Sequence, residues 1–188
     1  MERLKDLLDA RITETVATTR DEEGTPNAAP MGVLKEEDGV YARLWEGSTT
    51  LENVRATERV VVNFTRDPVV YVKTALGDGG EEFVSDGRLR DADGWVRCDA
   101  EHVKNPEGRD EVTRWQLAET DRRVVERVLP THSRGFASVI EATVHATRLS
   151  FKPELRELIE HHLEVARKCG GGREREAANL VEEHISEI

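Results

Sequence analysis

Cysteine is scarce in this 188-residue chain: only Cys98 and Cys169 occur, far apart and outside any CxxC pair. This pattern gives no disulfide framework, and we predict two free thiols, as in proteins of a reducing compartment. The chain also lacks an apolar run near the roughly 20 residues that span a bilayer. Its first residues, MERLKDLLDARI, contain no uninterrupted apolar core of the signal-peptide type. We therefore expect a cytoplasmic protein.

Positive charge is also in short supply. The chain has 27 Lys and Arg residues against 38 Asp and Glu residues, which gives a formal net charge of -11 at pH 7. Binding to nucleic acid requires a basic face, and anionic membrane surfaces attract basic segments. We therefore predict neither a nucleic-acid partner nor a membrane partner. The length suits one domain, or one domain with an appended helical piece.

Three motifs of nucleotide-dependent and hydrolytic enzymes are missing. The chain contains no Walker A motif, no GxGxxG motif and no GxSxG nucleophile elbow. The GDGG run at residues 77–80 does not match the dinucleotide motif, and its composition indicates a surface turn. The sequence pattern identifies no catalytic acid or base.

The six histidines are scattered along the chain. His161 and His162 are adjacent, so on a helix their side chains point about 100° apart and cannot share a metal ion. Glu141 and His145 have i, i+4 spacing and could supply two ligands to a metal. The interpretation that we favour is a surface pair or a buried hydrogen bond, and we predict no metal site.

Short runs rich in β-branched residues predict strands over the first two thirds of the chain. They lie at residues 11–19, 28–35, 40–45, 59–64, 68–76, 94–104 and 111–128. One short stretch, residues 50–58, has apolar residues at helical spacing. Because the connections are short and mostly carry no helix, the pattern favours an antiparallel barrel over a βαβ sheet.

The last third of the chain has the periodicity of helices. Helices are predicted at residues 133–149, 152–169 and 173–188. Ser133 is a plausible cap for the first helix, and Pro153 falls in the first turn of the second. The triple glycine at residues 170–172 predicts the turn between the second and third helices.

The GSTT run at residues 47–50 lies between a predicted strand and a predicted short helix. Its glycine allows close backbone approach, and its hydroxyls can donate hydrogen bonds to anionic oxygens. The free N–H groups and the dipole of the helix also favour negative charge at this point. Arg134, at a second helix start, adds a guanidinium that can bind phosphate. The alternative is that Ser48 or Thr49 only caps the helix, and spacing alone favours this cap.

Two stretches of the sequence resemble a known family. The run TPNAAPMGVLKEEDGVYARLWEGSTTLENVRATERVVVNF, residues 25–64, resembles the flavin-binding split β-barrel of the pyridoxamine-phosphate-oxidase and flavin-reductase superfamily. NAAPMG together with SRGFASVIEATVHATRL resembles, more specifically, the uncharacterised domain of unknown function 447 family over nearly the whole chain. The resemblance implies a mainly β protein with α (α+β). Its six- to seven-stranded antiparallel split β-barrel, of Greek-key type, would occupy residues 1–130, and a helical extension at residues 131–188 would pack on the barrel.

The resemblance also implies a cofactor, FMN, and the residues that hold it. The residues beside the isoalloxazine ring would be Asn27, Ala28, Ala29, Pro30, Met31 and Gly32. Ser48, Thr49 and Thr50 would hold the phosphate, together with Arg43. Asn53 and Asn63 are weaker candidates, and Arg134 is a further candidate for phosphate or for a dimer partner.

The resemblance implies an FMN-dependent oxidoreductase that passes electrons or hydride from a reduced nicotinamide or similar donor to a small acceptor. Two alternatives remain open: a non-catalytic FMN-binding carrier or sensor, and a split barrel that binds haem or a deazaflavin. Pyridoxamine-phosphate oxidases bring several basic residues to the phosphate, whereas GSTT contains none, so a vitamin B6 substrate is not implied. The superfamily also implies a homodimer with flavin at the subunit interface, where Trp45 and Trp115 could be anchors.

Overall fold

The computed structural model describes residues 4–8, 10–77, 81–105, 111–124 and 133–188. The chain forms two compact units. The barrel unit comprises Met1–Thr65 and Gly80–Arg127, and the helical unit comprises Arg66–Gly79 and Val128–Ile188. The boundary predicted between residues 130 and 131 lies outside the described residues. Within the described ranges, no helix is long and apolar enough to cross a membrane.

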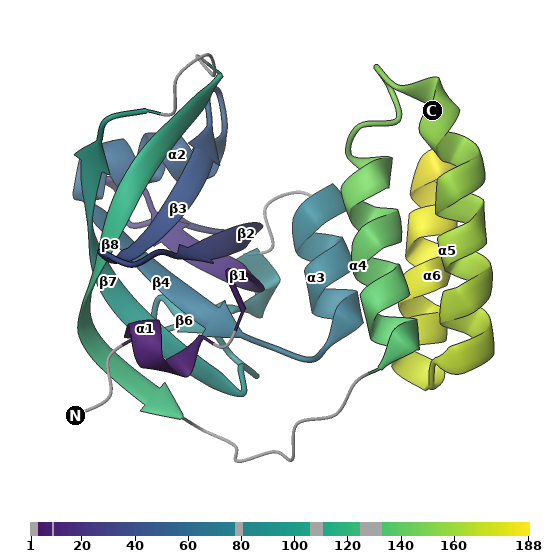
Figure 1. The fold of residues 1–188 in the computed structure, drawn as a ribbon, viewed down its shortest axis with the longest axis horizontal. Coiled ribbons are helices and arrows are strands. Elements are labelled where there is room, and N and C mark those ends of the chain that lie inside the picture. The colour runs from purple at the N-terminus through teal and green to yellow at the C-terminus, as the bar shows by residue number, and fades with distance from the viewer. Residues whose placement is uncertain (1–3, 9, 78–80, 106–110, 125–132) are drawn as a thin grey trace. The chain divides into compact units, whose positions relative to one another are not determined.

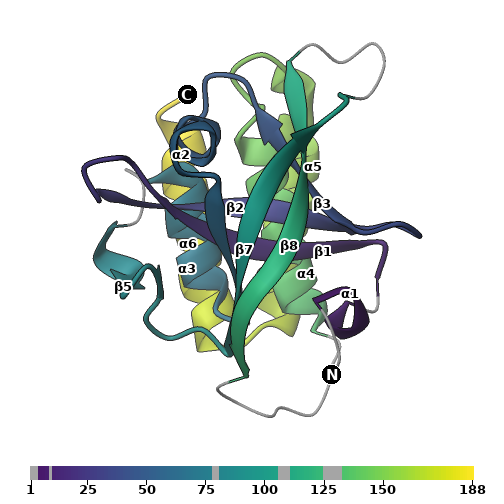
Figure 2. The same ribbon diagram turned by 90° about the vertical axis from the view of Figure 1, so that its left-hand side faces the viewer.

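The barrel unit is a closed antiparallel barrel of six strands (Figures 1 and 2). Its strands are β1 (Ile12–Arg20), β2 (Pro26–Lys35), β3 (Val40–Trp45), β4 (Arg59–Phe64), β7 (Gly94–Val103) and β8 (Val112–Val124). They follow the order β1-β2-β3-β8-β7-β4, and β4 closes the barrel by pairing with β1. The predicted six- to seven-stranded antiparallel barrel is therefore confirmed.

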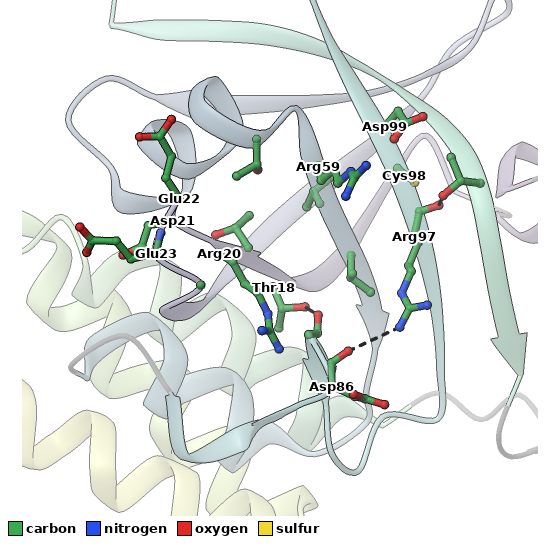
Figure 3. Close-up of a pocket in the computed structure, with 17 residues that line it drawn as sticks. Thr18, Arg20, Asp21, Glu22, Glu23, Arg59, Asp86, Arg97, Cys98 and Asp99 are labelled. Carbon is green, nitrogen blue, oxygen red and sulfur yellow. Dashed lines mark hydrogen bonds between the residues drawn. The ribbon is translucent and has the colours of Figure 1, made fainter.

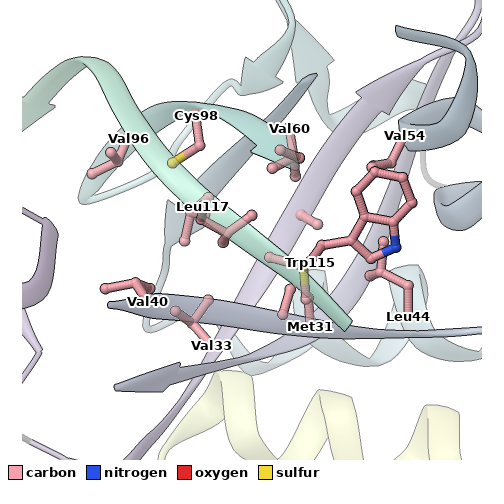
Figure 4. Packing of buried hydrophobic residues seen from close by; sticks show 14 of the residues in the cluster. Met31, Val33, Val40, Leu44, Val54, Val60, Val96, Cys98, Trp115 and Leu117 are labelled. Carbon is pink, nitrogen blue, oxygen red and sulfur yellow. The ribbon is translucent and has the colours of Figure 1, made fainter. Parts of the chain in front are cut away.

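Alternate side chains of the strands fill the inside of the barrel. This core contains Met31, Val33, Trp115 and Leu117, together with residues of all the remaining strands of the barrel (Figure 4). Trp115 is only 5% exposed, and its indole Nε1 donates to the Thr113 hydroxyl across 2.9 Å. The expectation that Trp115 anchors an interface is therefore wrong, because the ring is part of the barrel interior. Trp45, by contrast, is 55% exposed.

A small hairpin of the barrel unit was not predicted. It comprises the 3-10 turn η1 (Glu81–Phe83), β5 (Val84–Ser85) and β6 (Arg88–Leu89). Its two-residue turn, Asp86-Gly87, has positive φ at both positions, 58° and 76°. Such a turn matches the twist of a hairpin, and Asp-Gly is a preferred sequence for it. The SDGR run at residues 85–88 is therefore the sequence pattern that indicates this hairpin. A short helix, α1 (Leu4–Leu7), precedes the barrel.

Helix α2 (Thr49–Thr57) follows β3 and matches the short helix predicted at residues 50–58. Leu51 and Val54 are buried and belong to the barrel core. Because these two side chains are one turn apart, they hold one face of α2 against the barrel. The helix ends at Glu58, whose φ of 52° lies in the left-handed region.

The helical unit has a hydrophobic core of its own. It consists of α3 (Pro68–Leu76), α4 (Arg134–Ala146), the 3-10 turn η2 (Pro153–Leu155), α5 (Arg156–Cys169) and α6 (Gly172–Ser186). Helix α4 contacts each of α3, α5 and α6. Gly135 lies so close to α5 that a Cβ atom on it would be 2.5 Å from the Gly170 Cα. The three helices predicted in the last third of the chain are confirmed.

The strand predicted at residues 68–76 is wrong, because this segment is helix α3. Asp67 caps the helix, with its Oδ1 accepting from the Val69 amide across 2.9 Å, and Pro68 occupies the first turn. Val69 and Val72 then point into the core of the helical unit at i, i+3 spacing. The cap and the burial of one helical face outweigh the β preference of this valine-rich run.

Candidate functional site

The start of α2 combines a helix cap with free hydrogen-bond donors. The Ser48 hydroxyl donates to the Trp45 carbonyl across 2.7 Å and accepts from the Leu51 amide across 3.3 Å. Ser48 is therefore the cap that spacing favoured. The amide of Glu52 is taken by the Ser48 carbonyl. Among the described residues, nothing accepts from the amides of Thr49 and Thr50, so these N–H groups remain available to an anion.

The two threonines have different surroundings. Thr49 is exposed at the first position of the helix, whereas Thr50 is buried and 7% exposed. The Thr50 hydroxyl accepts a hydrogen bond from the Asn27 side-chain amide, with 3.1 Å between Nδ2 and Oγ1. The structure thus brings Asn27, which was predicted beside the isoalloxazine ring, together with Thr50, which was predicted at the phosphate.

A second amide–hydroxyl pair lies beside the first. The Asn53 side-chain amide donates to the Thr19 hydroxyl on β1 across 3.1 Å, and both groups are buried. Asn27 and Thr19 are opposite each other in the β1–β2 register. The two bonds therefore tie the first turns of α2 to the end of this strand pair, and Asn53 has an anchoring role.

Asn63 is fully buried and its side chain is heavily bonded. Its Nδ2 lies within hydrogen-bond distance of the Val16 carbonyl, the Thr18 hydroxyl and the Val61 carbonyl, at 2.9, 3.2 and 3.1 Å. Its Oδ1 accepts from the Leu89 amide across 2.9 Å. These contacts join β4, β1 and the small hairpin, so Asn63 holds the barrel unit together at this point.

The predicted ring-side residues divide between the two faces of β2. The Met31 side chain lies in the barrel core, and its carbonyl accepts from the Thr15 hydroxyl across 2.7 Å. Ala28, Pro30 and Gly32 alternate with Met31 and so lie on the other face of the strand. Small side chains on that face let a planar group approach the backbone. Ala29 belongs to the same face as Met31 by alternation.

The two predicted arginines lie in different units. Arg43 is half-buried on β3, opposite Arg114 of β8. Arg114 is neutralised by Glu36, at 2.7 Å, and stacks on the Tyr41 ring. Arg43 has no acidic partner in the described part of the chain. Arg134 is exposed at the start of α4, in the helical unit.

A cavity of about 790 Å³ lies on the barrel unit, beside the turn after β1, the start of β4 and the Asp86-Gly87 turn (Figure 3). Three arginines line it, Arg20, Arg59 and Arg97, against the five acidic residues Asp21, Glu22, Glu23, Asp86 and Asp99. This charge balance does not select an anionic ligand. None of the sequence-predicted residues is among those lining it. Its arginines come from β1, β4 and β7, which the β1–β4 and β4–β7 pairings bring together.

One side chain that lines this cavity, Cys98, has a strongly raised pKa. Burial raises the pKa of the Cys98 thiol to about 12, and the negative charges of Glu119 and Asp99 act in the same direction. Cys98 therefore stays a protonated thiol at neutral pH, and it is not a nucleophile for cavity chemistry.

Two family models match the chain. The protein of unknown function (DUF447) N-terminal domain matches residues 13–126, and the protein of unknown function (DUF447) model matches residues 133–183. An FMN-bound protein of the same family from Methanosarcina mazei is 34% identical, with 92% of this chain and 94% of that chain covered and a TM-score of 0.82.

More distant structures share the barrel. A split-barrel-domain protein described as a flavin reductase candidate from Shewanella frigidimarina is 13% identical, covers 66% of this chain and 75% of its own, and has a TM-score of 0.51. The flavin reductase HpaC, in complex with NADP+, is 14% identical, with 63% and 81% covered and a TM-score of 0.50. These two similarities show the fold alone. The family models and the Methanosarcina structure span both units, and this chain belongs to the DUF447 family of split-barrel proteins.

Proposed function

We propose that this chain binds FMN and works as an FMN-dependent oxidoreductase. One observation carries the proposal: a relative of the same family, 34% identical over 92% of this chain, is bound to FMN. The donor that we propose is a reduced nicotinamide, and the acceptor is a small molecule. When bound, FMN supplies the hydride and electron transfer of such a reaction.

The residues at the start of α2 fit a phosphate. The amides of Thr49 and Thr50 and the exposed Thr49 hydroxyl are donors that the described part of the fold leaves free. They lie at the positive end of the helix dipole, which favours a dianion. Gly47, with a φ of 79° and nothing within 4 Å of a Cβ position, leaves the approach open. Arg43 supplies positive charge without a described acidic partner.

The flat face of β2 fits the ring system. Ala28, Pro30 and Gly32 present no bulky side chain there, and the Asn27–Thr50 bond fixes this strand relative to α2. The protein would thus bind and orient the cofactor, and we assign no acid or base among these residues. The chemistry would depend on the cofactor and on the donor that it meets.

We also propose that the protein is a homodimer of a reducing compartment. Trp45 supports the dimer, because this large aromatic side chain is 55% exposed at the end of β3 and such residues are enriched in interfaces. The two free cysteines support the compartment. Light scattering at micromolar concentration tests the dimer, and a monomeric mass would contradict it.

The cofactor is tested by reconstitution. Tag-free protein is incubated with excess FMN, desalted and denatured, and the released flavin is identified by chromatography. We expect about one FMN per chain, whereas recovery of no flavin would overturn the proposal. Anaerobic addition of NADH or NADPH to the yellow protein then separates an enzyme from a carrier. We expect the flavin absorbance to bleach, and stable absorbance with both donors would leave a carrier or sensor.

A further inference from the structure

Three potential metal ligands meet between α4 and α5 of the helical unit. Glu141 and His145 lie one turn apart on α4, and His162 comes from α5, which packs against it. One ligand atom from each residue lies within 4.8 Å of the other two. The sequence spacing pairs Glu141 with His145, for which we favoured a surface pair or a buried hydrogen bond and predicted no metal site. The third residue comes from the packing of α5.

These side chains lie close together, but Glu141 and His145 form no hydrogen bond with each other. Nε2 of His145 lies 3.9 Å from Oε2 of Glu141, beyond hydrogen-bond distance. The His145 and His162 rings are 5.9 Å apart between centroids, with 30° between their planes. Nδ1 of His145 is buried and has no hydrogen-bond partner among the described residues. A buried polar atom without a partner is costly, so this cluster has a reason to take up a further group.

The donor atoms of the cluster suit a cation. Two of the three residues are histidines, and imidazole nitrogen is a ligand that divalent transition metals accept. Glu141, with its side chain 58% exposed, brings a carboxylate that can turn toward the imidazoles.

We propose that Glu141, His145 and His162 bind a divalent transition-metal ion, Zn²⁺ in preference to Mg²⁺ or Ca²⁺, which links α4 to α5. Two imidazoles and one carboxylate are a set that Zn²⁺ accepts, with a further position left for water. Mg²⁺ and Ca²⁺ prefer oxygen ligands alone. Bonds of about 2.0–2.2 Å place tetrahedral ligand atoms roughly 3.3 Å apart. Small side-chain rotations, chiefly of the exposed Glu141, close the present separations.

This site is independent of the proposed flavin function. All three ligands belong to the helical unit, and none is among the residues considered for FMN. Metal binding can therefore be measured on protein with or without flavin. A result for one proposal leaves the other unaffected.

The test is a Zn²⁺ titration by isothermal calorimetry of tag-free full-length protein, pretreated with EDTA and freed of the chelator. We expect one Zn²⁺ per chain and a loss of affinity of at least about tenfold in His145→Gln, His162→Gln and Glu141→Gln. His161→Gln is the matched control, because His161 is exposed and outside the cluster. It should bind like the parent. No saturable binding by the parent, or unchanged binding by all three ligand variants, overturns the site.

Thermal unfolding separates a lost ligand from a damaged fold. Zn²⁺ should raise the melting temperature of the parent and of His161→Gln but not that of His162→Gln, since binding to the folded state stabilises it. Glu141→Gln is the variant least able to perturb folding, because its side chain is mostly exposed. Cys169→Ser tests the exposed thiol as a competing ligand. If only this variant loses Zn²⁺, the metal binds at Cys169 and the proposal is wrong.

Discussion

Asn27 on β2 and Thr50 on α2 are joined by a buried hydrogen bond of 3.1 Å between the amide nitrogen and the hydroxyl oxygen. The bond fixes the start of α2 relative to the strand whose flat face carries Ala28, Pro30 and Gly32. The Asn53–Thr19 bond repeats the arrangement one turn further along the helix. The candidate phosphate position and the candidate ring position are therefore held by the same polar contacts.

The two threonines at the start of α2 should respond differently to replacement by alanine. Thr49→Ala removes an exposed hydroxyl, so the melting temperature should change little. FMN affinity should fall about tenfold or more, because a hydrogen bond to a charged oxygen contributes roughly 1.5–3 kcal/mol. Fluorescence titration measures both FMN and riboflavin, and the affinity for riboflavin, which lacks the phosphate, should stay the same. Equal losses for both flavins would show that Thr49 does not contact the phosphate.

Thr50→Ala should chiefly destabilise the fold. It leaves the buried Asn27 amide without its partner, which costs about 1–3 kcal/mol. Urea unfolding measures the free energy of unfolding, and Thr49→Ala, at the preceding residue, is the matched control. A stability equal to that of the parent would mean that Asn27 finds another acceptor.

Asn63→Ala should loosen the small hairpin. The substitution removes the acceptor of the Leu89 amide and the donor to Val16 and Thr18. Amide hydrogen exchange at Leu89 should speed up more than exchange in β8, because among the described strands β5 and β6 pair only with each other. Asn179→Ala, an exposed change on α6, is the control. Unchanged exchange at Leu89 would contradict the anchoring role of Asn63.

The barrel could be predicted because its evidence is local. Alternating apolar residues mark half-buried strands, and short connections without helices favour antiparallel neighbours. Helix α3 was missed because VVYV has the composition of a strand. Its Asp67-Pro68 start is a helix signal that should have outweighed the valines.

The candidate sites could be predicted only in part. The helix start at GSTT follows from residue types, and so does the i, i+4 spacing of Glu141 and His145. The Asn27–Thr50 contact spans 23 residues, and His162 meets α4 only through the packing register of two helices. No local pattern specifies such long-range contacts, and the same holds for the arginines of the cavity.

Gly135→Ala should destabilise the helical unit. A Cβ atom at this position would lie 2.5 Å from the Cα and 2.7 Å from the nitrogen of Gly170, so backbone has to move. Overpacking of this kind costs roughly 1–3 kcal/mol. Gly172→Ala is the control, because nothing lies within 4 Å of its Cβ position and alanine favours helix. Thermal unfolding compares the two, and equal melting temperatures would contradict the close packing.

The two cysteines should differ in reactivity. Cys98 is buried with a raised pKa, whereas Cys169 is exposed. At pH 8 the native protein should react with one equivalent of a thiol reagent such as Ellman's reagent, and the denatured protein with two. Cys169→Ser should abolish the reaction of the native protein, since thiolate and access are both required. A second fast equivalent in that variant would show that Cys98 is accessible.

The raised pKa of Cys98 also gives the stability a pH dependence of known sign. The folded thiol keeps its proton up to a pKa of about 12, from an ordinary value of 9.0. Between these values the unfolded chain binds fewer protons than the folded chain, so the free energy of unfolding falls as the pH rises. The contribution is complete below about pH 9, where both states are protonated. Cys98→Ala removes the titrating group, so between about pH 8.5 and 10.5 its melting temperature should fall less steeply than that of the parent. Circular dichroism measures both slopes, and parallel slopes would mean that Cys98 titrates alike in the two states.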